Sequence, residues 1–267
     1  MPETMESTRG LGAPVFVATP EEPGPQPSVV VLHERYGLVE HPRNMARRLA
    51  AAGYVAAAPN LFFEHPDQRG LADGTATARL TDPHALEILD DVLELLRTTP
   101  AADADRLAVL GACATGRHPV LWGANRHLDA CVVFHGLYRN REWEPDGEYH
   151  TEHLHDLVGR LQAPFLGLFG ELDHLVSVDD VRFIRGHFED QDKSYRIVCY
   201  AGAPHGWTDS TMSGRYRPEI AEAAWGELLT FLERHLVSPR LEPATVDWSY
   251  TSSKSRLYDF TANVRRD

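Results

Sequence analysis

Short apolar runs recur along the chain at a spacing typical of alternating strands and helices. Seven runs of strand length are apolar over nearly all of their positions: 14–18, 28–33, 54–59, 106–111, 130–136, 164–170 and 195–200. Strands of this kind are covered on both faces. Between them, apolar residues recur at helical spacing in the segments 41–53, 81–99, 117–125, 179–190 and 218–236. The pattern predicts an α/β fold with a mostly parallel central sheet and helices on both faces.

Two segments depart from this alternation. Residues 137–156 are polar and rich in turn-forming residues, which predicts a surface insertion or lid. The tail 238–267 carries Trp248, Tyr250, Tyr258 and Phe260, and its aromatic side chains indicate that it packs on its own domain or on a partner subunit. We therefore predict one domain over 1–237, with a lid insertion at 137–156, followed by a C-terminal extension over 238–267 through which a homodimer could form.

Composition and charge exclude several classes of function. The formal net charge is −13, whereas a nucleic-acid partner requires a basic face. Lys193 and Lys254 are the only lysines, and neither lies in an apolar run, so Schiff-base chemistry is not expected. Three cysteines do not make a disulfide framework. With no apolar leader and no run near the roughly 18 residues of a membrane span, a cytoplasmic location and no membrane partner are expected.

Three reactive side chains each follow a different predicted strand, where ligand sites form in such sheets. Cys113 lies in the pattern Gly111-x-Cys113-x-Thr115-Gly116 after the run 106–111, and small residues permit the tight turn that exposes a nucleophile. Asp173 and His205 follow the runs 164–170 and 195–200. Each residue alone also fits a structural role, but the order nucleophile, acid, histidine is that of α/β-hydrolases. The order favours a Cys-His-Asp triad.

These motifs resemble the dienelactone hydrolase family, the cysteine-triad branch of the α/β-hydrolase superfamily. The resemblance covers roughly residues 12–236 and rests on "VVVLHERYGL", "AAAPNLF", "LGACATG", "FGELDHLV" and "PHGW" in this order. It implies the α/β-hydrolase fold and a carboxymethylenebutenolidase-like carboxylic ester hydrolase. It also implies a nucleophilic Cys113, a basic His205 and an orienting Asp173.

Further roles follow from the same resemblance. Glu34 is expected to contact the resting thiol and help to control its ionisation. The backbone N–H groups of Ala114 and Arg35 are expected to form the oxyanion hole, one after the nucleophile and one after another strand. From their position alone, four aromatic side chains that follow strand-end motifs are candidates for the substrate pocket, although core packing is equally open for them: Tyr36, Trp207, Phe62 and Phe63.

Two positions depart from the family pattern. Thr115 stands where the family usually has a second glycine, so the turn could be crowded. Asp209 stands where the dienelactone-cleaving members place a basic residue that holds the substrate carboxylate, and an acid cannot pair with a carboxylate. The namesake substrate would therefore require another arginine, such as Arg79 or Arg141, in place of the missing cation.

The chemistry of a thiol narrows the expected substrates. A thiolate is itself a good leaving group, so a cysteine enzyme should prefer activated esters, enol lactones or thioesters over peptides. The predicted function is hydrolysis of a small activated ester or lactone through a thioester intermediate. Two alternatives remain open: a lactonisation or cyclisation step in a biosynthetic pathway, and a catalytically idle binding protein.

Three histidines of the lid segment and two cysteines are given structural roles. His150, His153 and His155 have a spacing that could hold zinc, but no further ligand pattern supports a metal, and a polar lid is favoured. No cofactor is expected. Cys131 and Cys199 lie within predicted strands and are predicted to be core residues.

Overall fold

Nine strands form one sheet in the computed structural model, which describes residues 3–7, 10–238 and 244–257. The order across the sheet is β1-β2-β4-β3-β5-β6-β7-β8-β9. In chain order the strands are β1 (Glu3–Ser7), β2 (Val15–Thr19), β3 (Gln26–Val31), β4 (Val55–Pro59), β5 (Ala102–Ala112), β6 (Ala130–Phe134), β7 (Phe165–Gly170), β8 (Tyr195–Tyr200) and β9 (Val246–Tyr250). All neighbours from β4 to β9 are parallel, whereas β2 is antiparallel to both β1 and β4. The predicted α/β class is confirmed.

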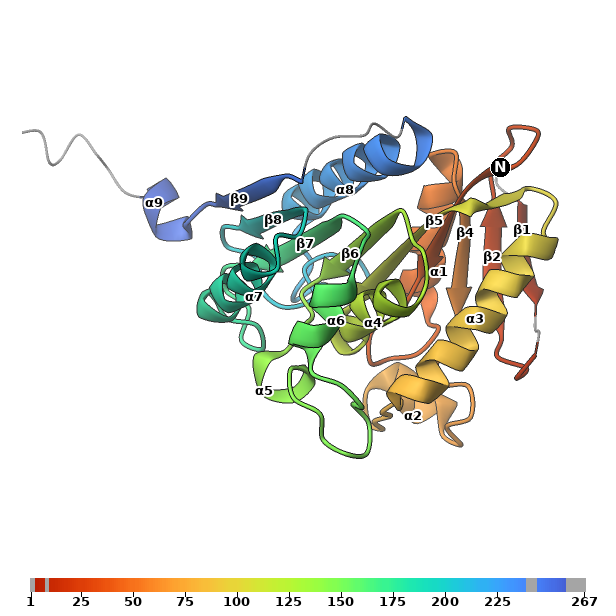
Figure 1. Cartoon of the computed structure of the whole chain (residues 1–267), viewed down its shortest axis with the longest axis horizontal. Helices are drawn as coiled ribbons and strands as arrows, with labels where there is room; N and C mark the ends of the chain where they lie inside the picture. Colours follow the sequence, from red (N-terminus) through yellow and green to blue (C-terminus); the bar gives the residue numbers. More distant parts are fainter. Residues whose placement is uncertain (1–2, 8–9, 239–243, 258–267) are drawn as a thin grey trace, which may run out of the picture.

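Helices cover both faces of this sheet (Figure 1). In chain order they are α1 (Glu40–Ala51), α2 (Gln68–Asp73), α3 (Asp82–Thr98), α4 (Arg117–Asn125), α5 (Arg139–Glu142), α6 (Leu154–Arg160), α7 (Val178–Asp190), α8 (Pro218–Leu232) and α9 (Ser253–Leu257). The short helical turn η1 (Cys113–Thr115) precedes α4, and a π-type turn η2 (Glu233–Val237) follows α8. One hydrophobic core packs α3, α4, α6 and α7 against the sheet, and a second packs α1 and α8 against the opposite face.

The alternation of strand side chains divides the sequence between the two cores. Val30 and Val109 point into the first core, whereas their neighbours Val29 and Leu110 point into the second. A fully buried strand needs apolar residues on both faces, which explains why the seven predicted runs lack alternation. All seven appear as strands with small shifts at their ends. The strand in the run 130–136 ends earlier than predicted, at Phe134, because His135 has a φ of 37°, which is not extended backbone.

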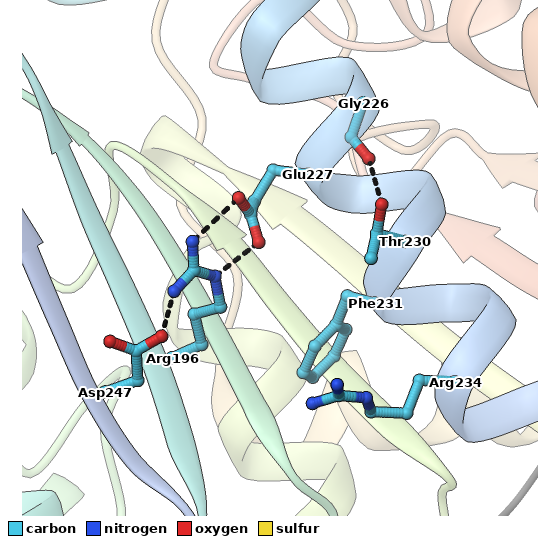
Figure 2. Close-up of a pocket in the computed structure, with 7 residues that line it drawn as sticks. All are labelled: Arg196, Gly226, Glu227, Thr230, Phe231, Arg234 and Asp247. Carbon is cyan, nitrogen blue, oxygen red and sulfur yellow. Dashed lines mark hydrogen bonds and ion pairs between the residues drawn. The ribbon is translucent and has the colours of Figure 1, made fainter.

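The described part of the C-terminal extension packs on its own domain. β9 adds a last parallel strand beside β8, and Figure 2 shows Arg196 of β8 between Glu227 of α8 and Asp247 of β9. These three residues line a shallow cavity of about 410 Å³ together with Gly226, Thr230, Phe231 and Arg234. The sequence pattern did not predict β9, since Val246 and Tyr250 at its two ends are exposed. The prediction of a homodimer through this extension stays a prediction, and Tyr258 and Phe260 lie outside the described residues.

The lid segment 137–156 is less superficial than its polar composition indicates. Its two ends are buried through Leu137, Tyr138, Trp143 and Leu154, while residues 144–149 between them are mostly exposed. Burial at both ends means that only the middle of the segment behaves as a surface insertion.

Candidate active site

Cys113 sits in a strained turn between β5 and α4. Its φ of 52° lies in the left-handed region, which costs a non-glycine residue on the order of 1–2 kcal/mol. The flanking glycines are required by close approach: a Cβ on Gly111 would lie 2.5 Å from the carbonyl oxygen of Thr115, and one on Gly116 would lie 2.6 Å from the Cα of Gly136. The turn therefore has the geometry of a nucleophile elbow.

Thr115 fits this turn without crowding it. Its side chain is fully buried, and its hydroxyl is 3.1 Å from both the backbone nitrogen and the carbonyl oxygen of Ala112. The hydroxyl thus accepts one hydrogen bond and donates another across the base of the elbow. Thr115 therefore occupies a position where the family usually has glycine, and its hydroxyl is accommodated there by hydrogen bonds to the backbone.

The three triad candidates meet at the carboxyl ends of their strands. The Nε2 atom of His205 lies 3.3 Å from the sulfur of Cys113, and its Nδ1 atom lies 2.8 Å from Oδ2 of Asp173. The other carboxylate oxygen of Asp173 accepts hydrogen bonds from the backbone N–H groups of Leu175 and Val176, at 2.8 and 3.0 Å. One imidazole therefore joins the thiol to a carboxylate that is fixed by its own loop.

The electrostatics of these groups favour a charged pair. Burial lowers the pKa of His205, but the hydrogen bonds to Asp173 and Cys113 outweigh it and raise the pKa to about 10. Burial raises the pKa of Asp173, and the hydrogen bond from His205 outweighs this effect, so that the carboxyl pKa lies below its usual value. At neutral pH the imidazole is protonated and faces the carboxylate on one side and the sulfur on the other.

Besides the three triad candidates, the site contains Tyr138, which contacts the sulfur and was not predicted from the sequence. Its hydroxyl donates a hydrogen bond to the Cys113 sulfur at 3.0 Å. Tyr138 lies in the lid segment, directly before α5, and only 8% of it is exposed. The polar composition of the segment concealed it, because the signal was one aromatic residue among turn formers.

Glu34 lies in the site, but its carboxylate pairs with a residue other than Cys113. Oε1 of Glu34 is 2.9 Å from Nε2 of His135, and both side chains are buried. Burial raises the pKa of Glu34, but the hydrogen bond from His135 overcomes it and lowers the pKa to about 2. Burial lowers the pKa of His135, which fits a neutral imidazole that donates its Nε2–H to a carboxylate. Within the described residues, the expected contact between Glu34 and the thiol is thus replaced by one to His135.

The loop that carries Glu34 and Arg35 is held by a second neutral histidine. Nδ1 of His33 donates to the carbonyl oxygen of Glu34 at 2.6 Å, and Nε2 accepts from the backbone N–H of Leu61 at 2.9 Å. Burial lowers the pKa of His33 to about 4, so Nε2 remains free to accept. The Arg35 side chain turns away to the carbonyl oxygen of Gly74, at 3.0 Å.

The four aromatic residues predicted as candidates for the substrate pocket lie in different environments. Trp207 is fully buried in the second core, with its ring centroid 5.1 Å from that of His135, and therefore packs against the site from within the core. Tyr36 is half-buried, with the Arg35 guanidinium 5.5 Å from its ring. Phe63 is half-buried against the first core. Phe62 lines an open groove of about 500 Å³ that extends to His84, but neither Cys113 nor His205 lines this groove.

Asp209, which departs from the family pattern, and Arg79, a possible replacement for the missing cation, each pair with other residues of the chain. Asp209 is buried, accepts from the N–H and hydroxyl of Thr211 at 2.8 and 2.7 Å, and lies 3.5 Å from Nδ1 of His41. Arg79 pairs with Asp146 at 2.8 Å, and Arg141 is exposed. Asp209 therefore closes a turn, and nothing in its contacts indicates a substrate anchor.

The lid histidines point to separate partners. His153 pairs with Glu144 at 2.7 Å and His155 lies 2.8 Å from His187, while His150 lies beside the ion pair of Asp82 and Arg117. Among the described residues, no three His, Cys, Asp or Glu side chains gather as metal ligands. The same residues include no helix with the length and apolar character needed to cross a bilayer.

The other two cysteines are core residues, as predicted. Cys131 and Cys199 are buried within β6 and β8. Burial raises the pKa of the Cys131 thiol well above its ordinary value and that of Cys199 to about 12. Both thiols are therefore protonated at neutral pH.

The chain is similar to known proteins over most of its length. The family model for the "Dienelactone hydrolase family" matches residues 13–236. An Escherichia coli O157:H7 protein named "Putative carboxymethylenebutenolidase" is 29% identical over 235 residues, which cover 85% of this chain and 84% of the relative. A Bradyrhizobium protein named "Probable 2-oxo-3-(5-oxofuran-2-ylidene)propanoate lactonase" is 27% identical over 236 residues, with coverage of 87% and 94%.

A solved structure shows the same architecture. The crystal structure of a protein from Klebsiella pneumoniae subsp. pneumoniae, described as "Putative Dienelactone Hydrolase", has a TM-score of 0.77 and 29% identity. The match covers 88% of this chain and 99% of that chain. The strand order, the elbow and the extent of these matches lead to one conclusion: the chain belongs to the dienelactone hydrolase family and is a hydrolase with the α/β-hydrolase fold.

Proposed function

We propose that this enzyme hydrolyses a small activated ester or lactone through a Cys113–His205–Asp173 triad and a thioester intermediate. The observation that carries the proposal is the position of His205, at 3.3 Å from the sulfur and 2.8 Å from the carboxylate. A base within hydrogen-bond reach of a nucleophile, itself oriented by a third group, is the arrangement that nucleophilic catalysis requires. The names of the lactonase and carboxymethylenebutenolidase relatives agree with such a substrate.

The reaction proceeds in two halves. In the first, the Cys113 sulfur attacks the carbonyl carbon, a carbon–sulfur bond forms, and the bond to the leaving oxygen breaks as that oxygen takes a proton from Nε2 of His205. In the second, His205 takes a proton from water, whose oxygen attacks the thioester, and the carbon–sulfur bond breaks to release the acid. Asp173 keeps Nδ1 of His205 as the donor, so that Nε2 faces the sulfur in both halves.

The oxyanion of both intermediates needs fixed donors. We assign this role to the backbone N–H groups of Ala114, which follows the nucleophile in η1, and Arg35, in the loop that His33 holds. Removing one such donor costs about 10²–10³ in rate in other hydrolases. Glu34 acts through this loop, because its bond to His135 ties the loop after β3 to the end of β6. Tyr36 and Phe63 are the half-buried aromatic residues that remain candidates for contact with the substrate.

A direct test compares leaving groups on one acyl group. Phenyl acetate and the matching anilide differ in the leaving atom, and a thiolate is expelled in preference to an amine. We expect turnover of the phenyl ester and no measurable turnover of the anilide. Rapid quenching followed by mass spectrometry should find one acetyl group on the peptide that contains Cys113. Anilide cleavage without an acylated cysteine would contradict the mechanism, and no turnover of esters or enol lactones would favour a cyclase or an idle binding protein.

Selective alkylation offers a second prediction that does not depend on the substrate. Cys113 faces a protonated imidazole, whereas Cys131 and Cys199 are buried as neutral thiols. Because the thiolate is the reactive form, brief treatment with iodoacetamide at neutral pH should label Cys113 at least tenfold more than either core cysteine. Peptide mapping measures the three extents, and equal labelling would contradict an activated Cys113.

A further inference from the structure

Tyr138 places a buried hydroxyl on the sulfur of Cys113. The distance of 3.0 Å is shorter than the 3.3 Å from Nε2 of His205 to the same atom. Within the described residues, this sulfur is the hydrogen-bond partner of the Tyr138 hydroxyl. A thiol is a weak acceptor, whereas hydrogen bonds to charged groups are about twice as strong as neutral ones. The contact is therefore suited to a thiolate.

Three hydrogen bonds hold the backbone around Tyr138 in place. The backbone N–H of Tyr138 donates to Oε2 of Glu142 at 2.9 Å, and the indole N–H of Trp143 donates to the carbonyl oxygen of Leu137 at 3.3 Å. Arg117, at the start of α4, donates to the carbonyl oxygen of Glu142 at 2.5 Å. Because α4 begins next to the elbow, the sulfur and the hydroxyl are fixed to the same helix. The contact is built into the fold rather than made by a mobile surface residue.

The phenol also keeps its proton. Burial and the neighbouring Cys113 raise the pKa of Tyr138 far above its ordinary value, so the hydroxyl remains a donor over the working pH range. It cannot serve as a base for the thiol. Its chemical contribution is a hydrogen bond to whatever negative charge the sulfur carries.

We propose that Tyr138 is a catalytic residue that stabilises the Cys113 thiolate, both in the resting enzyme and as the leaving group when the thioester is hydrolysed. The proposal rests on the triad mechanism above. In the second half-reaction, the water oxygen bonds to the carbonyl carbon, one water proton goes to Nε2 of His205, and the electron pair of the breaking carbon–sulfur bond goes to sulfur. Tyr138 donates to the sulfur throughout and loses no proton.

The competing interpretation is that the ring of Tyr138 merely covers the thiol. Cys113 is only 6% exposed, so a cover would also explain the contact. The two interpretations separate in Tyr138→Phe, which keeps the ring and removes the hydroxyl, and in Tyr138→Ala, which removes both. Tyr149→Phe is the matched control, because it removes a hydroxyl from the exposed part of the same segment.

The experiment measures the rate of Cys113 alkylation by iodoacetamide against pH, and the accumulation of acyl-enzyme from phenyl acetate. For Tyr138→Phe we expect the midpoint of the alkylation profile to move to higher pH by about 1 unit. We expect deacylation to slow about tenfold, so that acyl-enzyme accumulates while kcat and KM fall together. Tyr149→Phe should match the wild type, and a melting temperature equal to that of the wild type establishes that a variant is folded.

Each outcome separates the two proposals. An unchanged profile and unchanged deacylation in Tyr138→Phe overturn the role of Tyr138 while the triad stands, as does faster alkylation confined to Tyr138→Ala. The absence of both acyl-enzyme and preferential Cys113 labelling in the wild type removes the triad mechanism itself, and the role of Tyr138 with it.

Discussion

The Cys113→Ala variant is expected to lose hydrolysis of phenyl acetate by a factor on the order of 10⁴ or more. The physical reason is that the sulfur forms the covalent intermediate of the proposed mechanism, and no other side chain described in the site can replace it. Steady-state kinetics over a range of substrate concentrations measure the loss in kcat. Because the oxyanion donors are backbone groups, binding of the substrate should survive, and KM should change much less than kcat.

His205→Ala should cost nearly as much, and the double variant should be no worse than either single variant. Residues that act as one unit show such non-additivity, because removing one of them already disables the others. Cys199→Ala is the matched control, since it removes a buried thiol from strand β8 without removing a member of the proposed triad. Residual activity above a tenth of the wild type in folded Cys113→Ala would exclude this sulfur as the nucleophile.

The second large effect concerns stability and lies beside the site. Asp82 and Arg117 form a buried ion pair, with Oδ1 and Oδ2 of Asp82 at 3.0 and 2.8 Å from Nε and Nη2 of Arg117. Their side chains are 3% and 2% exposed. The guanidinium also donates to the carbonyl oxygen of Glu152 at 2.7 Å, and Oδ2 of Asp82 accepts from the backbone N–H of Thr151 at 3.0 Å. One buried pair thus joins α3, α4 and both ends of the lid segment.

Asp82→Ala should lower the free energy of unfolding by about 3–5 kcal/mol, because it leaves a buried guanidinium without its counter-charge. For a chain of this size, that loss lowers the melting temperature by roughly 2–4 °C per kcal/mol. Urea unfolding followed by circular dichroism gives the free energy, and a thermal scan gives the melting temperature.

The exposed ion pair of Arg48 and Glu222 supplies the control for this experiment. Its side chains are 43% and 59% exposed, so Glu222→Ala should cost less than about 1 kcal/mol. Equal losses in the two variants would show that burial of the Asp82 pair contributes nothing, and would contradict the assignment of this pair as the anchor of the lid segment.

The chain order of the reactive residues predicted that three candidate side chains would meet, and the structure brings them within hydrogen-bond distance of one another. Cys113, Asp173 and His205 each follow an apolar run, and parallel strands bring their carboxyl ends to one edge of the sheet. The sequence therefore predicted that these three side chains would lie together, without knowledge of any loop. It also indicated the strain at the elbow, since Gly111 and Gly116 flank the cysteine and only small residues fit there.

The loop conformations, in contrast, determine which side chains contact each other within the site. Glu34 was expected to contact the thiol, but it pairs with His135, 101 positions further along the chain. His135 lay at the end of a predicted strand, and its positive φ turns the chain where continued strand had been expected. Tyr138 reaches the sulfur for a similar reason, because Leu137 beside it also has a left-handed φ, of 64°.

The sequence by itself determined the α/β class, the two-sided burial of the strands and the order of the catalytic candidates, because apolar periodicity and strand-end position are local properties of the chain. Tertiary structure alone decided which side chains share the sulfur, which carboxylate His135 neutralises, and where the tail adds its strand. Those outcomes depend on loop conformations and on distances between segments far apart in sequence. A local pattern of apolar and polar residues carries no record of such distances.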